Sequence, residues 1–287
     1  MLGTVIRDFR VKKGIRPKDV YSGIMDKSSY WRFEQGETRT SFETMLAILR
    51  KLNVSMEEFI HEATDLGSHK FELLQERSRA ASNRRDFEEL KKVAAGFLEM
   101  YKEKQSIRYF HYHCVTQLLI FRLQNKDLPK KYTQPLMKYL MKCEKWTDYE
   151  ITLFTRVLYI FPKDSLELLF IEALKALEEY GELDLSKTQA VMLISNYFSL
   201  MIDFDDRQQV LKIKEILSQI QLPEISTYHR IRRNWLFEII ECYLTKEESY
   251  LEKAENWIEI FKMLEMKGVY DMHWNWTQRY GERIFDR

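Results

Sequence analysis

Apolar side chains recur at helical spacing along most of this 287-residue chain, and short breaks separate one apolar run from the next. From residue 69 onwards this pattern predicts eleven amphipathic helices. We expect them at about 69–83, 86–102, 106–125, 133–143, 148–161, 164–180, 186–203, 206–219, 226–244, 248–266 and 270–285. Eleven helices in about 220 residues form pairs of roughly 40 residues each, a period typical of helical-repeat solenoids. A compact all-α bundle is the alternative, because no pair carries the strict tetratricopeptide consensus.

Residues that begin and end helices support these limits. Thr147 and Glu150 have the spacing of a capping box, which predicts a helix start at this point. Helix-ending or helix-breaking residues stand beyond apolar runs or in the breaks: Gly181, Gly268, Pro129, Pro162 and Pro223.

The first 60 residues form a separate pattern of five short helices over one small core. The first helix ends near Gly14, and a second begins at Pro17, whose fixed φ suits a first turn. Ser41 is the expected N-cap of a fourth helix, and Asn53 stands where a left-handed C-terminal residue is wanted. The predicted fold is therefore all-α, with a helix-turn-helix domain over 1–62, a linker over 63–68 and a helical-repeat solenoid over 69–287.

The segment 26–36 predicts a helix that can enter a DNA major groove. Met25, Tyr30 and Phe33 can face inward, which leaves an outer face of residues that reach base edges and phosphates: Lys27, Ser28, Trp31 and Arg32. Further DNA-binding candidates precede it: Arg7, Arg10, Lys12, Lys13, Arg16 and Lys18. Residues 1–39 hold nine Lys or Arg against five Asp or Glu, whereas the whole chain carries +1. This concentration of positive charge favours DNA binding over the alternative, a protein-interaction domain.

The N-terminal segment resembles the phage-repressor type of helix-turn-helix and, more narrowly, the Rgg family of bacterial peptide-sensing regulators. The similarity lies in Val20–Ile24, Lys27 and Ser28, and Arg32–Thr38. The sequence departs from the wider class at Pro17 and Tyr21. Because Pro17 replaces a residue that contacts phosphate in the class, Arg16 or Lys18 would have to supply that contact. The resemblance also implies that Arg10 pairs with Glu34 as an internal brace.

Two later segments, Tyr149–Phe154 and Ser195–Asp203, resemble the degenerate tetratricopeptide-like domain of the same family. The resemblance implies that Asn196 binds a peptide backbone, and a carboxamide has the donors and the acceptor to do so. The alternative is an asparagine bonded to a neighbouring helix. Met192 and Ser199 share the outer face of its helix.

Arg156 is the second peptide-binding candidate, because a guanidinium can form a bidentate contact with a carboxylate. Thr152 and Tyr159 lie on the same side of its predicted helix, and the alternative is a surface salt bridge. Weaker candidates follow on a later helix and near the linker: Arg230, Arg233, Asn234, Arg84 and Arg85.

Other functional classes find little support. No run approaches the roughly 18 apolar residues of a membrane span, and the N-terminus lacks a secretory signal. Cys114, Cys143 and Cys242 are expected to be free thiols of a cytoplasmic protein. His111, His113 and Cys114 are too few for a structural zinc site. We expect no metal, no cofactor and no enzymatic activity.

Together with the resemblance to the Rgg family, these patterns imply a cytoplasmic quorum-sensing regulator that binds double-stranded promoter DNA as a homodimer. A short, largely apolar signalling peptide would bind in the groove of the helical repeats. Two alternatives stay open: a regulator of the same build that senses a protein or a small molecule, and an interaction scaffold that has lost DNA binding.

Overall fold

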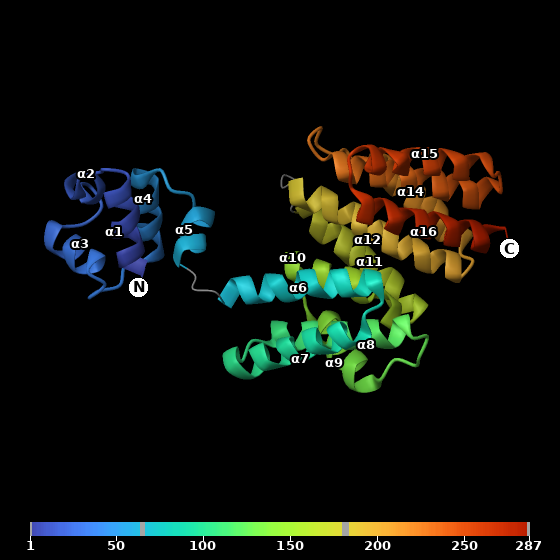
Figure 1. Cartoon of the computed structure of the whole chain (residues 1–287), viewed down its shortest axis with the longest axis horizontal. Helices are drawn as coiled ribbons and strands as arrows, with labels where there is room; N and C mark the ends of the chain where they lie inside the picture. The colour runs from blue at the N-terminus through green and yellow to red at the C-terminus, as the bar shows by residue number, and fades with distance from the viewer. Residues whose placement is uncertain (1, 64–66, 180–183, 286–287) are drawn as a thin grey trace. The chain divides into compact units, whose positions relative to one another are not determined.

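The computed structural model describes residues 2–63, 67–179 and 184–285, and every regular element in these ranges is helical (Figure 1). The chain divides into two compact units, Met1–Arg77 and Ser78–Arg287, here called the N-terminal and C-terminal units. Within the expected linker over 63–68, Ala63 ends one helix and Gly67 begins the next. Residues 64–66 between them lie outside the described residues, as does Gly181.

The N-terminal unit contains the five short helices that the sequence predicts. They are α1 (Leu2–Lys12), α2 (Pro17–Tyr21), α3 (Lys27–Glu34), α4 (Phe42–Leu52) and α5 (Met56–Ala63). Ile6, Val20, Tyr30, Ile48 and Leu52 are fully buried in their common core. Burial of apolar surface on this scale is the main favourable contribution to folding.

Local signals place the ends of these helices as predicted. Ser41 is the N-cap of α4, and its Oγ accepts a hydrogen bond from the Thr44 N–H at 3.2 Å. Asn53 has φ 49°, so it adopts the expected left-handed conformation after α4. Close packing at Gly3 joins α1 to α3, because a Cβ added there would lie 1.8 Å from the carbonyl oxygen of Phe33.

The helices from α6 onwards number eleven in the described residues, as predicted. They are α6 (Gly67–Arg84), α7 (Phe87–Lys104), α8 (Ile107–Leu123), α9 (Lys130–Lys142), α10 (Asp148–Val157), α11 (Lys163–Glu179), α12 (Asp184–Asp203), α13 (Arg207–Gln219), α14 (Thr227–Thr245), α15 (Ser249–Met263) and α16 (Lys267–Ile284). The capping box of Thr147 and Glu150 is present at the start of α10. α10 ends earlier than expected, because a 3-10 turn, η1 (Leu158–Ile160), replaces its last residues before Pro162.

Contacts between alternate helices reproduce the predicted period. Asn196 on α12 bonds to Thr155 on α10 across 41 residues, and Trp235 on α14 bonds to Thr277 on α16 across 42 residues. In these two pairs a helix contacts the helix two places ahead, at a separation close to the expected pair of about 40 residues. Buried apolar side chains form one continuous core from α8 to α16.

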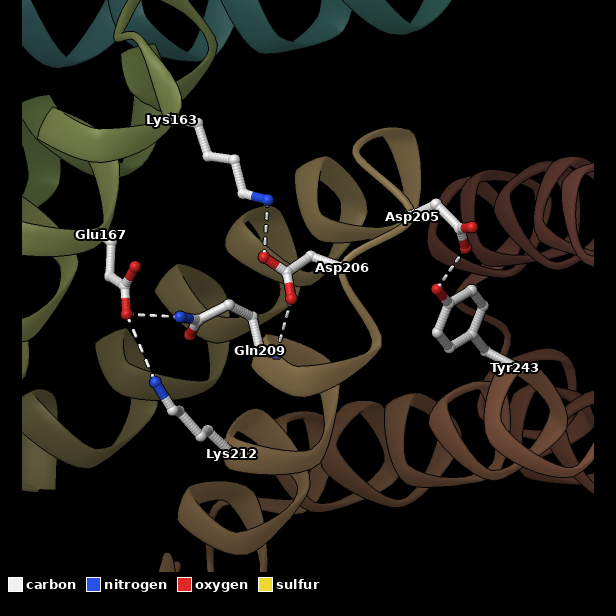
Figure 2. A network of polar contacts seen from close by, with 7 residues as sticks. All are labelled: Lys163, Glu167, Asp205, Asp206, Gln209, Lys212 and Tyr243. Atoms are coloured by element: carbon white, nitrogen blue, oxygen red, sulfur yellow. Dashed lines mark hydrogen bonds and ion pairs between the residues drawn. The ribbon is translucent and has the colours of Figure 1, made fainter.

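Polar contacts link α11 to the start of α13, and α14 to the turn before α13 (Figure 2). Lys163 on α11 lies 2.7 Å from Asp206, which caps α13. Next to it, the Tyr243 hydroxyl on α14 donates to Asp205 at 2.8 Å. These contacts fix the turn between α12 and α13 against the helices on both sides.

Candidate functional sites: a basic helix face and an arginine-lined cavity

A complete N-terminal cap fixes the start of α3. Asp26 Oδ1 accepts hydrogen bonds from the N–H groups of Ser28 and Ser29, both at 2.9 Å. The hydroxyls of the same two serines also donate to the Asp26 carboxylate, and these bonds hold its pKa well below the usual range. Ser28, a predicted DNA contact, therefore already uses its hydroxyl proton within the helix cap.

The two faces of α3 divide as the sequence predicts. Tyr30 and Phe33 are buried, whereas Lys27, Trp31 and Arg32 are exposed on the outer face. Met25 is only half-buried. The outer face thus combines two cations with an indole ring, a set of groups that can reach phosphates and base edges.

Arg10 and Glu34 form the buried brace that the resemblance implied. Arg10 Nε lies 2.6 Å from Glu34 Oε1, and its second fork nitrogen lies 2.8 Å from Oε2. The Tyr30 hydroxyl also donates to Glu34, at 2.7 Å, and the hydrogen bond to Glu34 raises the pKa of Arg10. Arg10 is 8% exposed and its charge is neutralised by Glu34 inside the unit. The prediction that Arg10 contacts DNA is therefore wrong.

Internal partners also engage three other cationic candidates. Lys12 pairs with Asp8 at 2.6 Å, and Arg16 pairs with Asp19 at 2.8 Å. Lys13 donates to the Asn53 carbonyl at 2.8 Å. Within the part of the chain that the structure describes, four exposed cationic candidates make neither an ion pair nor a side-chain hydrogen bond: Arg7, Lys18, Lys27 and Arg32.

The C-terminal unit contains a cavity of about 450 Å³. It lies among α8, α10, η1, α12 and α16, with one side chain from the turn after α6. Five predicted residues line it: Arg85, Arg156, Tyr159, Asn196 and Ser199. Helices that are far apart in the sequence therefore bring the two main candidates, Asn196 and Arg156, to one site.

Five arginines give the cavity its chemical character. They are Arg85, Arg122, Arg156, Arg279 and Arg283, all exposed to solvent, and no acidic side chain is among the lining residues. Arg122 stacks on the Tyr159 ring at 4.1 Å, and Arg283 pairs with Asp203 at 3.0 Å. Burial raises the pKa of Tyr159 to about 12, so its phenol stays neutral. The site therefore favours an anionic group.

The sequence interpretation missed Arg122, Arg279 and Arg283. A signal existed for the last two, because Arg279 and Arg283 are four residues apart and so share one face of the final helix. Nothing in the sequence connected that face to Arg156.

The other predicted peptide contacts do not line the cavity: Arg84, Thr152, Met192, Arg230, Arg233 and Asn234. Arg230 donates to the Leu222 carbonyl at 2.9 Å, and Arg233 donates to the Ile220 carbonyl at the same distance. These two arginines therefore tie down the segment before α14. Gln189 donates to Thr152 at 3.4 Å, so Thr152 belongs to a contact between α12 and α10.

Asn196 has a structural contact as well as a place on the cavity wall. Its amide nitrogen donates to the Thr155 carbonyl at 2.8 Å and so joins α12 to α10. Among the described residues, its carboxamide oxygen has no hydrogen-bond partner. This oxygen can therefore accept a hydrogen bond from a ligand.

The histidines and cysteines are engaged or buried elsewhere. His111 Nδ1 lies 2.7 Å from the Tyr149 hydroxyl, and His113 Nδ1 lies 2.8 Å from the Ala94 carbonyl oxygen. Cys114 is fully buried, and all three cysteines are free thiols. The described ranges bring no three metal-ligating side chains together. None of their helices has both the length and the apolar character needed to cross a bilayer.

Comparisons with known proteins match both parts of the chain. The helix-turn-helix family model matches residues 6–59. The model described as "HTH-type transcriptional regulator Rgg, C-terminal domain" matches residues 96–274, more than half of the chain.

Solved structures share the fold at low sequence identity. A putative transcriptional regulator from Listeria monocytogenes EGD-e is 19% identical, with a TM-score of 0.79 over 98% of this chain and 97% of the other. The SHP pheromone receptor Rgg2 from Streptococcus dysgalactiae is 20% identical, with a TM-score of 0.74 over 97% and 99%. The complex of PrgX with cCF10 is 17% identical, with a TM-score of 0.65 over 99% and 92%. The chain belongs to the Rgg family of helix-turn-helix transcriptional regulators.

Proposed function

We propose that this Rgg-family regulator is a cytoplasmic quorum-sensing protein that binds promoter DNA as a homodimer and is controlled by a short signalling peptide. The observation that carries the proposal is the pairing of two sites in one chain. One is the exposed face of α3, with Lys27, Trp31 and Arg32, and the other is the arginine-lined cavity.

DNA binding rests on the rigidity and charge of α3. The Asp26 cap fixes one end of the helix, and the Arg10–Glu34 brace fixes the other. A recognition helix held in this way loses little conformational entropy on binding. Its cations then supply phosphate contacts, and the exposed guanidinium of Arg32 is suited to bind a guanine edge.

Dimerisation follows from the small size of this surface. A helix of eight residues contacts only a few base pairs, whereas useful specificity needs two half-sites. A symmetric dimer presents two such helices at a fixed spacing.

The cavity supports peptide control. A structural relative is a bacterial peptide pheromone receptor solved with its pheromone, and PrgX is a second relative solved in complex with cCF10. Here the cavity offers the Asn196 carboxamide oxygen to a backbone N–H and five guanidinium groups to carboxylates. Peptide binding changes promoter binding only if the peptide has different affinities for two states of the protein.

Titration of promoter DNA with the full-length protein tests the DNA half of the proposal. Affinity should fall steeply as salt rises, because phosphate binding releases counterions. Arg32→Ala should cost roughly 1–3 kcal/mol and relax base preference at one position of the site. Arg7→Ala should weaken all sequences alike and flatten the salt slope. Lys175→Ala, which removes an exposed charge from α11, is the matched control.

Mapping of bound genomic DNA, with and without conditioned medium from the source bacterium, tests the peptide half. Occupancy that changes with the medium supports a secreted ligand. Unchanged occupancy rejects peptide control, and DNA affinity that is insensitive to salt favours an interaction scaffold.

A further inference from the structure

Arg232 on α14 is buried without an acidic partner. It is 1% exposed, and no carboxylate lies within ion-pair distance of it among the described residues. Its fork nitrogens donate to two neutral hydroxyls, Tyr228 at 3.2 Å and Ser195 at 3.1 Å. Its Nε has no hydrogen-bond partner in the described ranges, and its guanidinium lies 5.0 Å from the Trp276 ring.

Two of these neighbours connect Arg232 to the cavity. Ser195 and Trp276 both line the arginine-lined cavity, whereas Arg232 itself does not. The buried guanidinium therefore lies directly behind the cavity wall. It differs from the five lining arginines, which are exposed and hence hydrated.

The hydroxyl of Ser195 is free to donate a hydrogen bond. A hydroxyl oxygen that accepts a bond from a guanidinium must direct its own proton elsewhere. Helical threonines in this unit donate theirs to the carbonyl four residues back, as Thr155 does to Ile151 and Thr277 to His273. Ser195 makes no such bond within the described residues, so its proton remains for a group in the cavity.

Burial of an uncompensated charge is unfavourable, and removal of one partner from a buried ion pair is among the most destabilising of changes. Arg232 is already in that state when the cavity holds no anion. An anion bound at Ser195 would supply the missing negative charge, because electrostatic attraction is strong where water is excluded.

We propose that Ser195 and Arg232 form a carboxylate subsite in the wall of the cavity. The Ser195 hydroxyl donates to a carboxylate of the bound peptide, and Arg232 acts as a positioning residue that orients this hydroxyl and adds its charge. The subsite rests on the proposed peptide function and specifies its ligand chemistry. The ligand carries an acidic side chain or a free C-terminus at this point.

Two small probes test the subsite with the full-length protein and no DNA: acetyl-Asp-Asp, and acetyl-Asn-Asn-amide as its uncharged counterpart. Calorimetric titration with each probe gives an acid-to-amide affinity ratio. In the parent protein this ratio should exceed one, and acetyl-Asp-Asp should raise the melting temperature. Loss of a hydrogen bond to a charged group corresponds to about a tenfold change in affinity or more. Ser195→Ala should therefore lower the ratio about tenfold.

Arg232→Met distinguishes a positioning residue from a merely structural one. It should lower the ratio to a similar extent, while the melting temperature of the unliganded protein stays the same or rises, because a methionine fills the space without a buried charge. Arg233→Met is the matched control at the next position of α14. It should lower stability through the lost bond to Ile220 and leave the ratio unchanged.

A ratio near one in the parent, or an unchanged ratio in Ser195→Ala, overturns the subsite. If Arg232→Met fails to fold, Ser195→Ala and Arg232→Lys decide the question. Because DNA plays no part in these titrations, an intact ratio together with promoter binding that ignores peptide would reject the proposed function and leave the subsite standing.

Discussion

Each unit of this protein buries an arginine, and the two are held in opposite ways. In the N-terminal unit, two guanidinium nitrogens of Arg10 donate to the two oxygens of the Glu34 carboxylate, and the Tyr30 hydroxyl donates to the same carboxylate. In the C-terminal unit, Arg232 donates to two neutral hydroxyls and lies over an aromatic ring, and none of the described residues pairs a carboxylate with it. The first arrangement is complete within the chain, whereas the second lacks a negative charge.

The difference matches the tasks proposed for the two units. A DNA reader needs one rigid surface, and a compensated buried pair holds α1 to α3 in a single geometry. A sensor must respond to its ligand, and an uncompensated charge lets an anion stabilise the occupied state more than the empty one.

The largest expected effect comes from making the N-terminal arginine resemble the C-terminal one. Glu34→Gln keeps the shape of the side chain but leaves the buried Arg10 without its carboxylate. We expect a loss of about 3–5 kcal/mol in the free energy of unfolding of this unit. Hydrogen exchange of peptides from residues 2–63 measures it and reports separately on the two units.

Asp19→Asn is the control for this comparison, because it removes the carboxylate of the exposed Arg16–Asp19 pair. Exposed pairs contribute about 0–1 kcal/mol. Equal losses in the two variants would show that burial gives the brace no special weight.

A second change tests whether the brace alone fixes α1 against α3. In Gly3→Ala the new Cβ would lie 1.8 Å from the Phe33 carbonyl oxygen, and a backbone atom cannot move aside as a side chain does. We expect a loss of about 3 kcal/mol, at the upper end of typical overpacking penalties. Gly268→Ala places a methyl group in open space near the start of α16 and serves as the control for the added methyl group alone. Similar losses in both variants would contradict a close approach at Gly3.

The N-terminal unit was predictable because its signals are local. Ser41 and Asn53 cap or end α4 through contacts within a few residues, so the sequence is sufficient to place them. The number of helices in the C-terminal half was likewise predictable, since helical period and short breaks determine it. The early end of α10 was missed, because Phe154, Leu158 and Phe161 keep helical spacing in the sequence although Leu158–Ile160 form a 3-10 turn.

The cavity could be predicted only in part, because it depends on which helices meet. Asn196 and Arg156 were identified, but Arg279 lies 83 residues beyond Asn196 and no local pattern joins them. The sequence did contain an indication that Arg232 is buried, which the sequence interpretation missed. With Tyr228, Trp235 and Ile239 it forms an inward stripe at helical spacing, and an arginine in an apolar stripe indicates a buried charge.

A third prediction compares how the two units respond to acid. Burial, together with the charge of Arg232, lowers the pKa of His273 to about 4, and burial lowers that of His111 to about 4. As pH falls through 6.5, the ordinary pKa of histidine, these histidines become protonated in the unfolded chain but stay neutral in the folded unit. The free energy of unfolding of the C-terminal unit should therefore decrease, by on the order of 1 kcal/mol per histidine between pH 7 and pH 5.5.

The shifted acids of the N-terminal unit, including Asp26 and Glu58, have lowered pKa values. Their contribution persists above the ordinary carboxyl range and is lost only as pH falls below it. Hydrogen exchange at pH 7 and pH 5.5 should thus show destabilisation in the C-terminal unit, and substitution of His273 by Phe should reduce it. A uniform loss in both units would break the comparison.

The smallest expected effect concerns Asn196, which stands between the structural and the sensing role. Its amide nitrogen already joins α12 to α10, so Asn196→Ala should cost about 1 kcal/mol in unfolding free energy whatever the function of the cavity. Gln189→Ala is the matched control, because Gln189 also bridges α12 to α10 through Thr152 but does not line the cavity.

If the free oxygen of Asn196 accepts a hydrogen bond from a peptide N–H, only Asn196→Ala should also weaken peptide binding. The loss should be several-fold for acidic and amidated peptides alike, because a backbone contact does not depend on side-chain charge. Calorimetry on both variants separates the two roles. Equal peptide affinities in the two variants would leave Asn196 as a bridge between helices and assign ligand recognition to the guanidinium groups alone.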